Sequence, residues 1–313
     1  MAGSRLGIWL VCLVALLVLI LFGHVNPLAY LLLGTWLPLP LLLVGWRLGT
    51  GAAVLLALAG ILAVIALTPG ASFLLDNLGL GMILLMGLIL IACCRRGWPT
   101  GSAIMFSVVG VGLVYAVFFL GQAYFQNLTP VALWDQKTRE AAKTFIKMLK
   151  ETGMDSPSFE VMGLSGVSVQ DLVTRLVPAL VLINAGLVAW LNMLVGRRLV
   201  SSWGWGDLGE PLSQWSSPEW LIFFFLGAGF ALLAPLAWMR QVGLNLLVIL
   251  GFVYFCQGMA VIAGLLQRFQ VHWFLRGLAY LLAFLNPLMI LVVILGLIDL
   301  WLDFRRLRPP REA

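Results

Sequence analysis

The stretch LNLLVILGFVYFCQGMAVIAGLL at residues 244–266 carries no charged side chain. About 20 apolar residues in a helix cross the ~30 Å hydrocarbon core of a bilayer, so this stretch predicts a transmembrane helix. Similar apolar runs follow one another along most of the chain, at residues 6–22, 27–46, 51–67, 78–94, 101–124, 172–195, 219–239 and 273–302. The sequence therefore predicts an all-α fold, a polytopic bundle of eight or nine transmembrane helices.

The composition agrees with a membrane protein throughout. Of the 313 residues, 62% are hydrophobic and 10% are charged, whereas soluble chains carry about 25% charged residues. We expect residues 1–313 to form a single integral membrane domain in the bacterial inner membrane, with the lipid bilayer as a partner. The net charge of +6 comes mainly from arginines at loop ends and at the C-terminus. This pattern is typical of membrane insertion, and we expect no nucleic-acid partner.

Basic residues in short loops indicate the orientation of the bundle. A cytoplasmic N-terminus also places a set of loop arginines inside, namely Arg47, Arg95, Arg96, Arg197, Arg198, Arg268 and Arg276. Nine crossings would put the basic tail at residues 305–311 outside, against the same rule. Pro287 lies near the middle of the last run and, because proline disrupts a helix, predicts a re-entrant hairpin there. That hairpin would give eight crossings with both ends inside, and both counts stay open.

Other prolines predict breaks in further runs. Pro38 and Pro40 lie within the second run, Pro178 within the sixth and Pro235 within the seventh. Proline has no backbone N–H and disturbs the helix around it. Broken helices that turn free backbone groups into a cavity are a common binding device of transporters.

The one long polar segment covers residues 126–170 and predicts an extramembrane loop that contains a helix at about 130–152. Thr129 followed by Pro130 is typical of a helix N-cap with proline at the first helical position. Trp134 and Phe145 then fall on an apolar side, and Lys143 and Lys147 on the opposite one. This pattern suits an amphipathic helix in the membrane interface, and equally a solvated helix packed over the mouth of the bundle.

Polar side chains within the apolar runs are the candidates for a binding site, because each needs a partner in hydrocarbon. We predict four substrate-binding residues, Asn184, Asn192, Gln257 and Asn286, although hydrogen-bonding between helices explains each amide taken singly more simply. Asp299, near the end of the last run, is a candidate for ion or proton coupling. A structural carboxylate with a basic neighbour at the interface is the favoured alternative.

The residues needed for an intramembrane enzyme are scarce. The chain has two histidines and four cysteines without regular spacing, so a three-histidine metal site cannot form within one chain. A Gly-x-x-x-x-Gly-Lys-Ser/Thr loop for nucleotide phosphates is also missing from the sequence. We therefore predict no enzyme activity, no catalytic residue, no metal and no cofactor, and any nucleotide energy would come from a partner.

Three motifs in the C-terminal half carry a family resemblance. Gly-Leu-Ile-Asp-Leu-Trp-Leu-Asp-Phe-Arg-Arg at 296–306, Trp-Ser-Ser-Pro-Glu-Trp at 215–220 and Gly-Leu-Asn-Leu-Leu at 243–247 resemble the YybS-like family of bacterial multi-span membrane proteins. Pro-Leu-Pro at 38–40 and Gly-Trp-Arg-Leu-Gly at 45–49 resemble the start of substrate-binding subunits of energy-coupling-factor transporters. The first resemblance implies a multi-span bundle, and the second implies solute capture.

These features favour a transporter-like membrane protein that captures a small molecule and needs an external energy source. Such a subunit would have an ATPase or a membrane coupling subunit as its partner. The alternative is a non-transporting scaffold that recruits cell-envelope or division proteins through the interfacial helix and the basic tail. A cavity lined by the predicted amides would favour the first, and a solid bundle with an exposed apolar groove the second.

Overall fold

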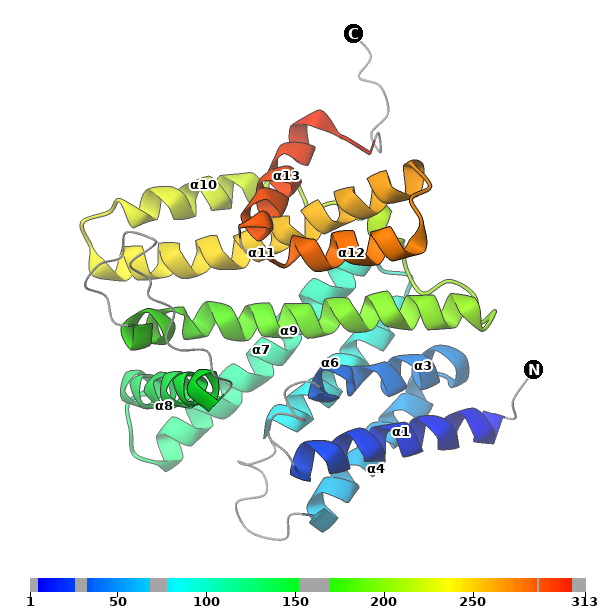
Figure 1. The fold of residues 1–313 in the computed structure, drawn as a ribbon. Coiled ribbons are helices and arrows are strands. Elements are labelled where there is room, and N and C mark those ends of the chain that lie inside the picture. The colour runs from blue at the N-terminus through cyan, green and yellow to red at the C-terminus, as the bar shows by residue number, and fades with distance from the viewer. Residues whose placement is uncertain (1–4, 26–32, 68–77, 152–168, 286, 306–313) are drawn as a thin grey trace. The chain divides into compact units, whose positions relative to one another are not determined.

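The computed structural model describes residues 5–25, 33–67, 78–151, 169–285 and 287–305 (Figure 1). Within these ranges the chain forms helices and no strand, which confirms the all-α prediction. The α-helices are α1 (Arg5–Val25), α3 (Pro38–Leu48), α4 (Thr50–Leu67), α6 (Leu78–Arg95), α7 (Thr100–Phe125), α8 (Pro130–Glu151), α9 (Val169–Ser202), α10 (Leu221–Leu232), α11 (Ala237–Arg268), α12 (Trp273–Ala283) and α13 (Leu288–Leu302).

Four of the described helices are long and apolar enough to cross a membrane, and they belong to α1, α7, α9 and α11. The helices α12 and α13 qualify only as a pair, which is bent by 99°. Three shorter apolar helices cover Thr50–Ala66, Gly79–Arg95 and Leu221–Leu232. Each predicted run thus contains a helix, but the described residues support four or five spans rather than the expected eight or nine.

Proline accounts for two of the shortened runs. In the second run, a 3-10 turn at Gly34–Trp36 precedes α3, which starts at Pro38, a favourable place for a residue without an N–H. In the seventh run, α10 ends at Leu232, and Pro235 lies in the connection to α11. The breaks predicted at Pro38 and Pro235 are confirmed, and a single helix over 219–239 is not formed.

The helices group into two compact units. One contains residues 1–115 and 184–215, and the other contains residues 116–183 and 216–313. Two of the three boundaries fall inside helices, one in α7 and one in α9, and the third lies between Trp215 and Ser216 in the connection before α10. The single integral membrane domain expected for residues 1–313 stays a prediction.

In the first unit, α3 lies against α1, α4 and α6. Leu41, Leu42 and Val44 of α3 are fully buried, as are Leu56 of α4 and Leu90 of α6. A helix that is apolar on all sides is expected in the middle of a bundle, where neighbours cover every face. The short α3 is therefore the centre of this unit.

In the second unit, α11 packs against both α10 and α13. Two glycines set the close approach of α11 and α13. A Cβ atom added to Gly258 of α11 would collide with the carbonyl oxygen of Val292, and one added to Gly296 of α13 would collide with that of Tyr254. Glycine at such positions lets two helix backbones touch, as small residues do in membrane bundles.

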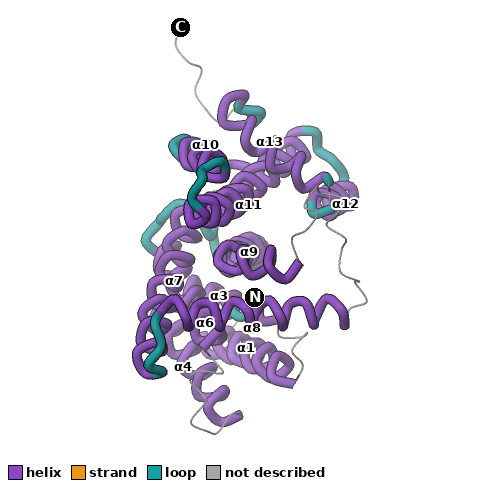
Figure 2. Tube along the Cα trace, turned by 90° about the vertical axis from the view of Figure 1, so that its left-hand side faces the viewer, coloured by secondary structure: helices purple, strands orange, loops and turns teal. Residues whose placement is uncertain are grey.

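The polar segment contains the helix that its pattern predicts. The structure places α8 at Pro130–Glu151, almost the predicted 130–152. The hydroxyl oxygen of Thr129 accepts a hydrogen bond from the backbone N–H of Ala132 at 3.2 Å, as an N-cap does. In Figure 1 the helix α8 is seen nearly end-on, and in Figure 2 it lies crosswise to the first part of α9.

Candidate functional site

Gln257 and Asp299, two of the predicted site residues, meet in the second unit. Gln257 of α11 is 1% exposed, and its Nε2 donates a hydrogen bond to Oδ2 of Asp299 at 3.2 Å. Its Oε1 accepts hydrogen bonds from the hydroxyl of Ser217 and, at 3.2 Å, from the backbone N–H of the same residue. The buried amide is thus held at both ends, which fixes its orientation.

Asp299 accepts hydrogen bonds from Phe304 and Arg305, the residues that follow α13, and we call this arrangement of three residues the clasp. Asp303 follows the helix in the left-handed conformation, with φ 40° and ψ 60°. This turn brings the backbone N–H of Phe304 to Oδ1 of Asp299 at 3.1 Å and Nη2 of Arg305 to Oδ2 at 2.7 Å. Both side chains of this ion pair are 3% exposed. The basic neighbour expected for Asp299 is therefore Arg305, which the turn places within reach.

Tyr254 is a further polar residue of this region, and the sequence analysis did not select it. Its side chain is fully buried, and its ring packs edge-on against Phe225 of α10 with centroids 5.4 Å apart. Among the described residues its hydroxyl has no hydrogen-bond partner. Since Tyr254 precedes Gln257 by three residues, both lie on one face of α11. A buried tyrosine hydroxyl ordinarily has a hydrogen-bond partner, which makes Tyr254 a candidate for binding a polar group.

The other predicted amides lie elsewhere. Asn192 belongs to the first unit, where its Nδ2 donates to the carbonyl oxygens of Thr35 at 2.6 Å and Val188 at 2.7 Å. Its Oδ1 is buried without a partner among the described residues. Asn184 occupies an exposed position on α9, and Asn286 lies outside the described residues. Gln257 and Asp299 are thus the two predicted residues that the structure joins directly.

A second polar contact, made by Asn245, replaces the backbone hydrogen bond that Pro178 disturbs in α9. Pro178 was expected to break this run, but α9 continues through it because Asn245 of α11 bridges the disturbed turn. Oδ1 of Asn245 accepts from the N–H of Ala179 at 3.0 Å, and its Nδ2 donates to the carbonyl of Arg175 at 2.9 Å. These two backbone groups would bond each other in a regular helix. The break predicted at Pro178 is therefore wrong, and Asn245 is a structural amide that the sequence analysis missed.

We expect Asn245→Leu to lower the stability of the protein in detergent by about 2 kcal/mol, because the buried N–H of Ala179 loses its partner, whereas the carbonyl of Arg175 keeps its bond from Gln241. Gln241→Leu should have a smaller effect, since the carbonyl of Arg175 keeps its bond from Asn245. Adding Pro178→Ala should reduce the cost of Asn245→Leu, because the helix can then restore its own bonding. Chemical unfolding measures these losses. If Asn245→Leu lowers the unfolding free energy by the same amount in the wild type and in Pro178→Ala, Asn245 does not bridge the turn at the proline.

The described residues contain no group of three or more His, Cys, Asp or Glu side chains placed to hold a metal ion. The four cysteines are free and buried. What the site offers chemically is therefore hydrogen bonding from the Tyr254 hydroxyl, beside the engaged Gln257 amide and the Asp299–Arg305 ion pair.

Comparison with known proteins gives one match. A family model described as "Predicted membrane protein (DUF2232)" matches residues 12–300, nearly the whole chain. No curated protein and no solved structure matches the sequence or the fold. The resemblances to the YybS-like family and to energy-coupling-factor subunits are not confirmed by these comparisons.

Proposed function

The chain belongs to the DUF2232 family of predicted membrane proteins, and we propose that it is a transport protein that captures a small solute. The observation that carries this proposal is the Tyr254 hydroxyl, buried without a described partner one helical turn from the fixed Gln257 amide. Polar groups inside membrane helices commonly mark substrate pathways, because leaving them unsatisfied in hydrocarbon is costly.

The proposed solute is neutral and polar. Asp299 and Arg305 already balance each other at 2.7 Å, so the region offers hydrogen bonds without net charge. A neutral molecule with hydroxyl or amide groups would satisfy Tyr254 without needing a counter-charge. Ion or proton coupling by Asp299 stays a prediction, and it would require the clasp to open, since both carboxylate oxygens are engaged.

The irregular helices of the second unit also support the proposal of a transport protein. The bent pair α12 and α13 resembles the discontinuous helices with which transporters build midplane sites. The chain would need an external energy source, such as an ATPase with a membrane coupling subunit, because its sequence has no phosphate-binding loop. The proposal assigns no catalytic step to the chain.

We further propose an even number of crossings of a bacterial inner membrane, with both ends in the cytoplasm. The α12–α13 pair follows the end of α11, and a full crossing of about 30 Å would bring its own end back by about 20 residues along α11, to the level of Val248. Asp299 instead bonds Gln257, which is 11 residues before Arg268 and therefore only about 16 Å from that end of α11. This contact and the 99° bend favour a re-entrant pair over a full crossing.

The topology is tested by fusing a reporter to the C-terminus of the full chain. A C-terminus in the cytoplasm predicts a fluorescent protein that folds there and an alkaline phosphatase fusion without activity, because that enzyme folds only after export. Fusions in the polar segment at residues 126–170 should give the opposite pattern and serve as the control. An active phosphatase at the C-terminus would establish an odd number of crossings and contradict the re-entrant pair.

A scaffold that recruits cell-envelope proteins is the second candidate, favoured by the exposed, charged face of α8. Mass spectrometry of the gently solubilised, affinity-purified protein separates the two. A small molecule at stoichiometric occupancy, or a co-purifying ATPase with its coupling subunit, supports solute capture. Envelope proteins alone, with no bound metabolite, would overturn the transport proposal in favour of the scaffold.

A further inference from the structure

The first unit collects its arginines at one end, where α3, α6 and α9 finish and α1, α4 and α7 begin. At this end, Nη1 of Arg95 after the last turns of α6 donates to the carbonyl oxygen of Trp46 in α3 at 3.1 Å. Nε1 of Trp46 donates at 3.1 Å to the carbonyl oxygen of Trp205, just after α9. Nε1 of Trp9 in α1 donates at 3.3 Å to the carbonyl oxygen of Ala52 at the start of α4. Six arginines lie here, and we call them the arginine end: Arg5, Arg47, Arg95, Arg96, Arg197 and Arg198.

Two cations of the arginine end are held by partners without a net charge. Nη1 of Arg95 donates to the carbonyl oxygens of Gly45 at 3.0 Å and Trp46 at 3.1 Å. The guanidinium carbon of Arg47 lies 5.7 Å from the ring centroid of Trp205, a cation–π contact. Backbone carbonyls and an indole ring do not neutralise a cation, so these two arginines are held in place and keep their charge.

Acidic side chains do not balance the arginine end. Asp207 and Glu210 are the acids in its described residues, and the charges of both act on Arg197. The ion pairs between described residues lie in the second unit, on α8 and at the end of α13. Six arginines and two acids leave a net charge of +4. The helix dipoles add little to it, because three helices begin and three finish there.

Tryptophan side chains indicate the depth of this end in the membrane. The candidate spans of α1, α7 and α9 each have one terminus here, at Arg5, Thr100 and Ser202. Trp203 is 49% exposed and lies against Trp205, with ring centroids 4.8 Å apart. Indole rings at the ends of spans are typical of the membrane–water interface. The arginine end therefore lies at the level of the lipid headgroups.

We infer that the arginine end binds the headgroup of an anionic phospholipid through Arg47, Arg95 and Arg96, all three of which are exposed. The occupant is indicated by the net positive charge and by the depth, because anionic headgroups lie at that level. A guanidinium is a planar fork of donors that matches two phosphate oxygens. Arg95 uses only Nη1 to bind α3, and its other nitrogens have no partner among the described residues. This inference does not depend on the proposed transport function.

Native mass spectrometry of the full-length protein in detergent micelles tests the inference. The probe is phosphatidylglycerol, titrated beside phosphatidylcholine with the same acyl chains. We expect the first phosphatidylglycerol to bind at least about tenfold more tightly, because the choline group cancels the charge that the arginines attract. Equal binding of the two lipids would overturn the inference.

The double variant Arg47→Gln, Arg96→Gln should lose most of this preference. It keeps Arg95, which joins the ends of α3 and α6, so its melting temperature in detergent should stay that of the wild type. Arg96→Gln alone removes a side chain without a hydrogen bond or ion pair among the described residues, and it should show a smaller loss of the same kind. A preference that persists in the folded double variant would mean that the lipid binds elsewhere and that the inference is wrong.

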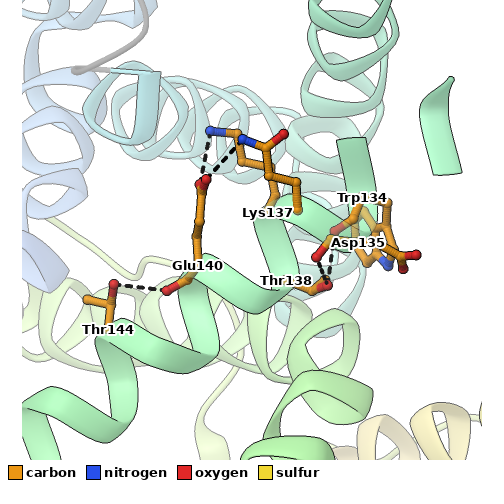
Figure 3. Close-up of polar contacts among 7 residues, drawn as sticks. Trp134, Asp135, Lys137, Thr138, Glu140 and Thr144 are labelled. Atoms are coloured by element: carbon orange, nitrogen blue, oxygen red, sulfur yellow. Dashed lines mark hydrogen bonds and ion pairs between the residues drawn. The ribbon is translucent and has the colours of Figure 1, made fainter. Parts of the chain in front are cut away.

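Two cations of α8 provide the matched control, because they face an acid. Nζ of Lys137 pairs with Oε2 of Glu140 at 3.5 Å (Figure 3). The hydrogen bond from Gln136 and the charges of Lys137 and Lys143 hold the pKa of Glu140 below its ordinary value, so this carboxylate is ionised at neutral pH. The variant Lys137→Gln, Lys143→Gln removes the same charge as the double arginine variant and should keep the preference for phosphatidylglycerol. An equal loss in both double variants would indicate attraction by overall charge and would also overturn the inference.

Discussion

Gly258→Ala should prevent α13 from packing stably on α11, although it adds a single methyl group. The new Cβ would overlap the carbonyl oxygen of Val292, and the carbon of that carbonyl would lie at 2.9 Å. A backbone cannot move aside as a flexible side chain can, so the two helices must separate. We expect a loss of about 3 kcal/mol or more in unfolding free energy, measured in detergent micelles.

Gly251→Ala is the matched control for this prediction. Gly251 lies on the same helix, and a Cβ atom at that position would meet nothing within 4 Å. Alanine is the better helix former, so this variant should be neutral or slightly stabilising. If Gly258→Ala and Gly251→Ala melt at the same temperature, α11 and α13 do not approach as closely as described.

Arg305→Ala should be the second strongly destabilising change. It leaves the carboxylate of Asp299, which is 3% exposed, without its counter-charge. Removing one partner of a buried ion pair costs about 3–5 kcal/mol, because the remaining charge stays desolvated. Thermal unfolding in detergent should show this loss, together with faster proteolysis of the C-terminal end, which the clasp no longer holds.

The double variant Asp299→Leu, Arg305→Met should recover much of that stability, because two apolar side chains replace the pair without leaving a lone charge. Lys137→Ala, which breaks an exposed pair with Glu140, should leave the melting temperature unchanged and provides the surface control. A single Arg305→Ala variant as stable as the wild type would show that the clasp does not form.

The local signals in the sequence were most reliable where few residues decide the structure. Thr129 and Pro130 fixed the start of α8 because capping and a missing N–H act within one turn. Pro235 similarly separates α10 from α11. Apolar runs predicted the existence of helices well but not their ends. The helix α11 begins at Ala237, seven residues before its run, because a helix continues through the polar side chains of Arg240 and Gln241.

The candidate site was predicted only in part, because partners depend on packing between distant segments. Gln257 and Asp299 are 42 residues apart, and no spacing rule connects them. The turn at Asp303 that brings Arg305 to Asp299 is also absent from any pattern, since aspartate adopts positive φ only occasionally. For Asn245 a weak signal existed: a proline within an apolar helix requires a polar group from a neighbour. Which amide supplies it follows only from the fold.

The most direct test of the proposed solute site is native mass spectrometry of the wild type beside Tyr254→Phe and Tyr280→Phe. Both variants remove one hydroxyl, but only Tyr254 is fully buried. We expect a bound small molecule on the wild type and on Tyr280→Phe, with occupancy reduced at least about tenfold in Tyr254→Phe, the loss expected for one buried hydrogen bond. Equal occupancy in all three proteins, or no bound molecule in any of them, would contradict solute capture at this site.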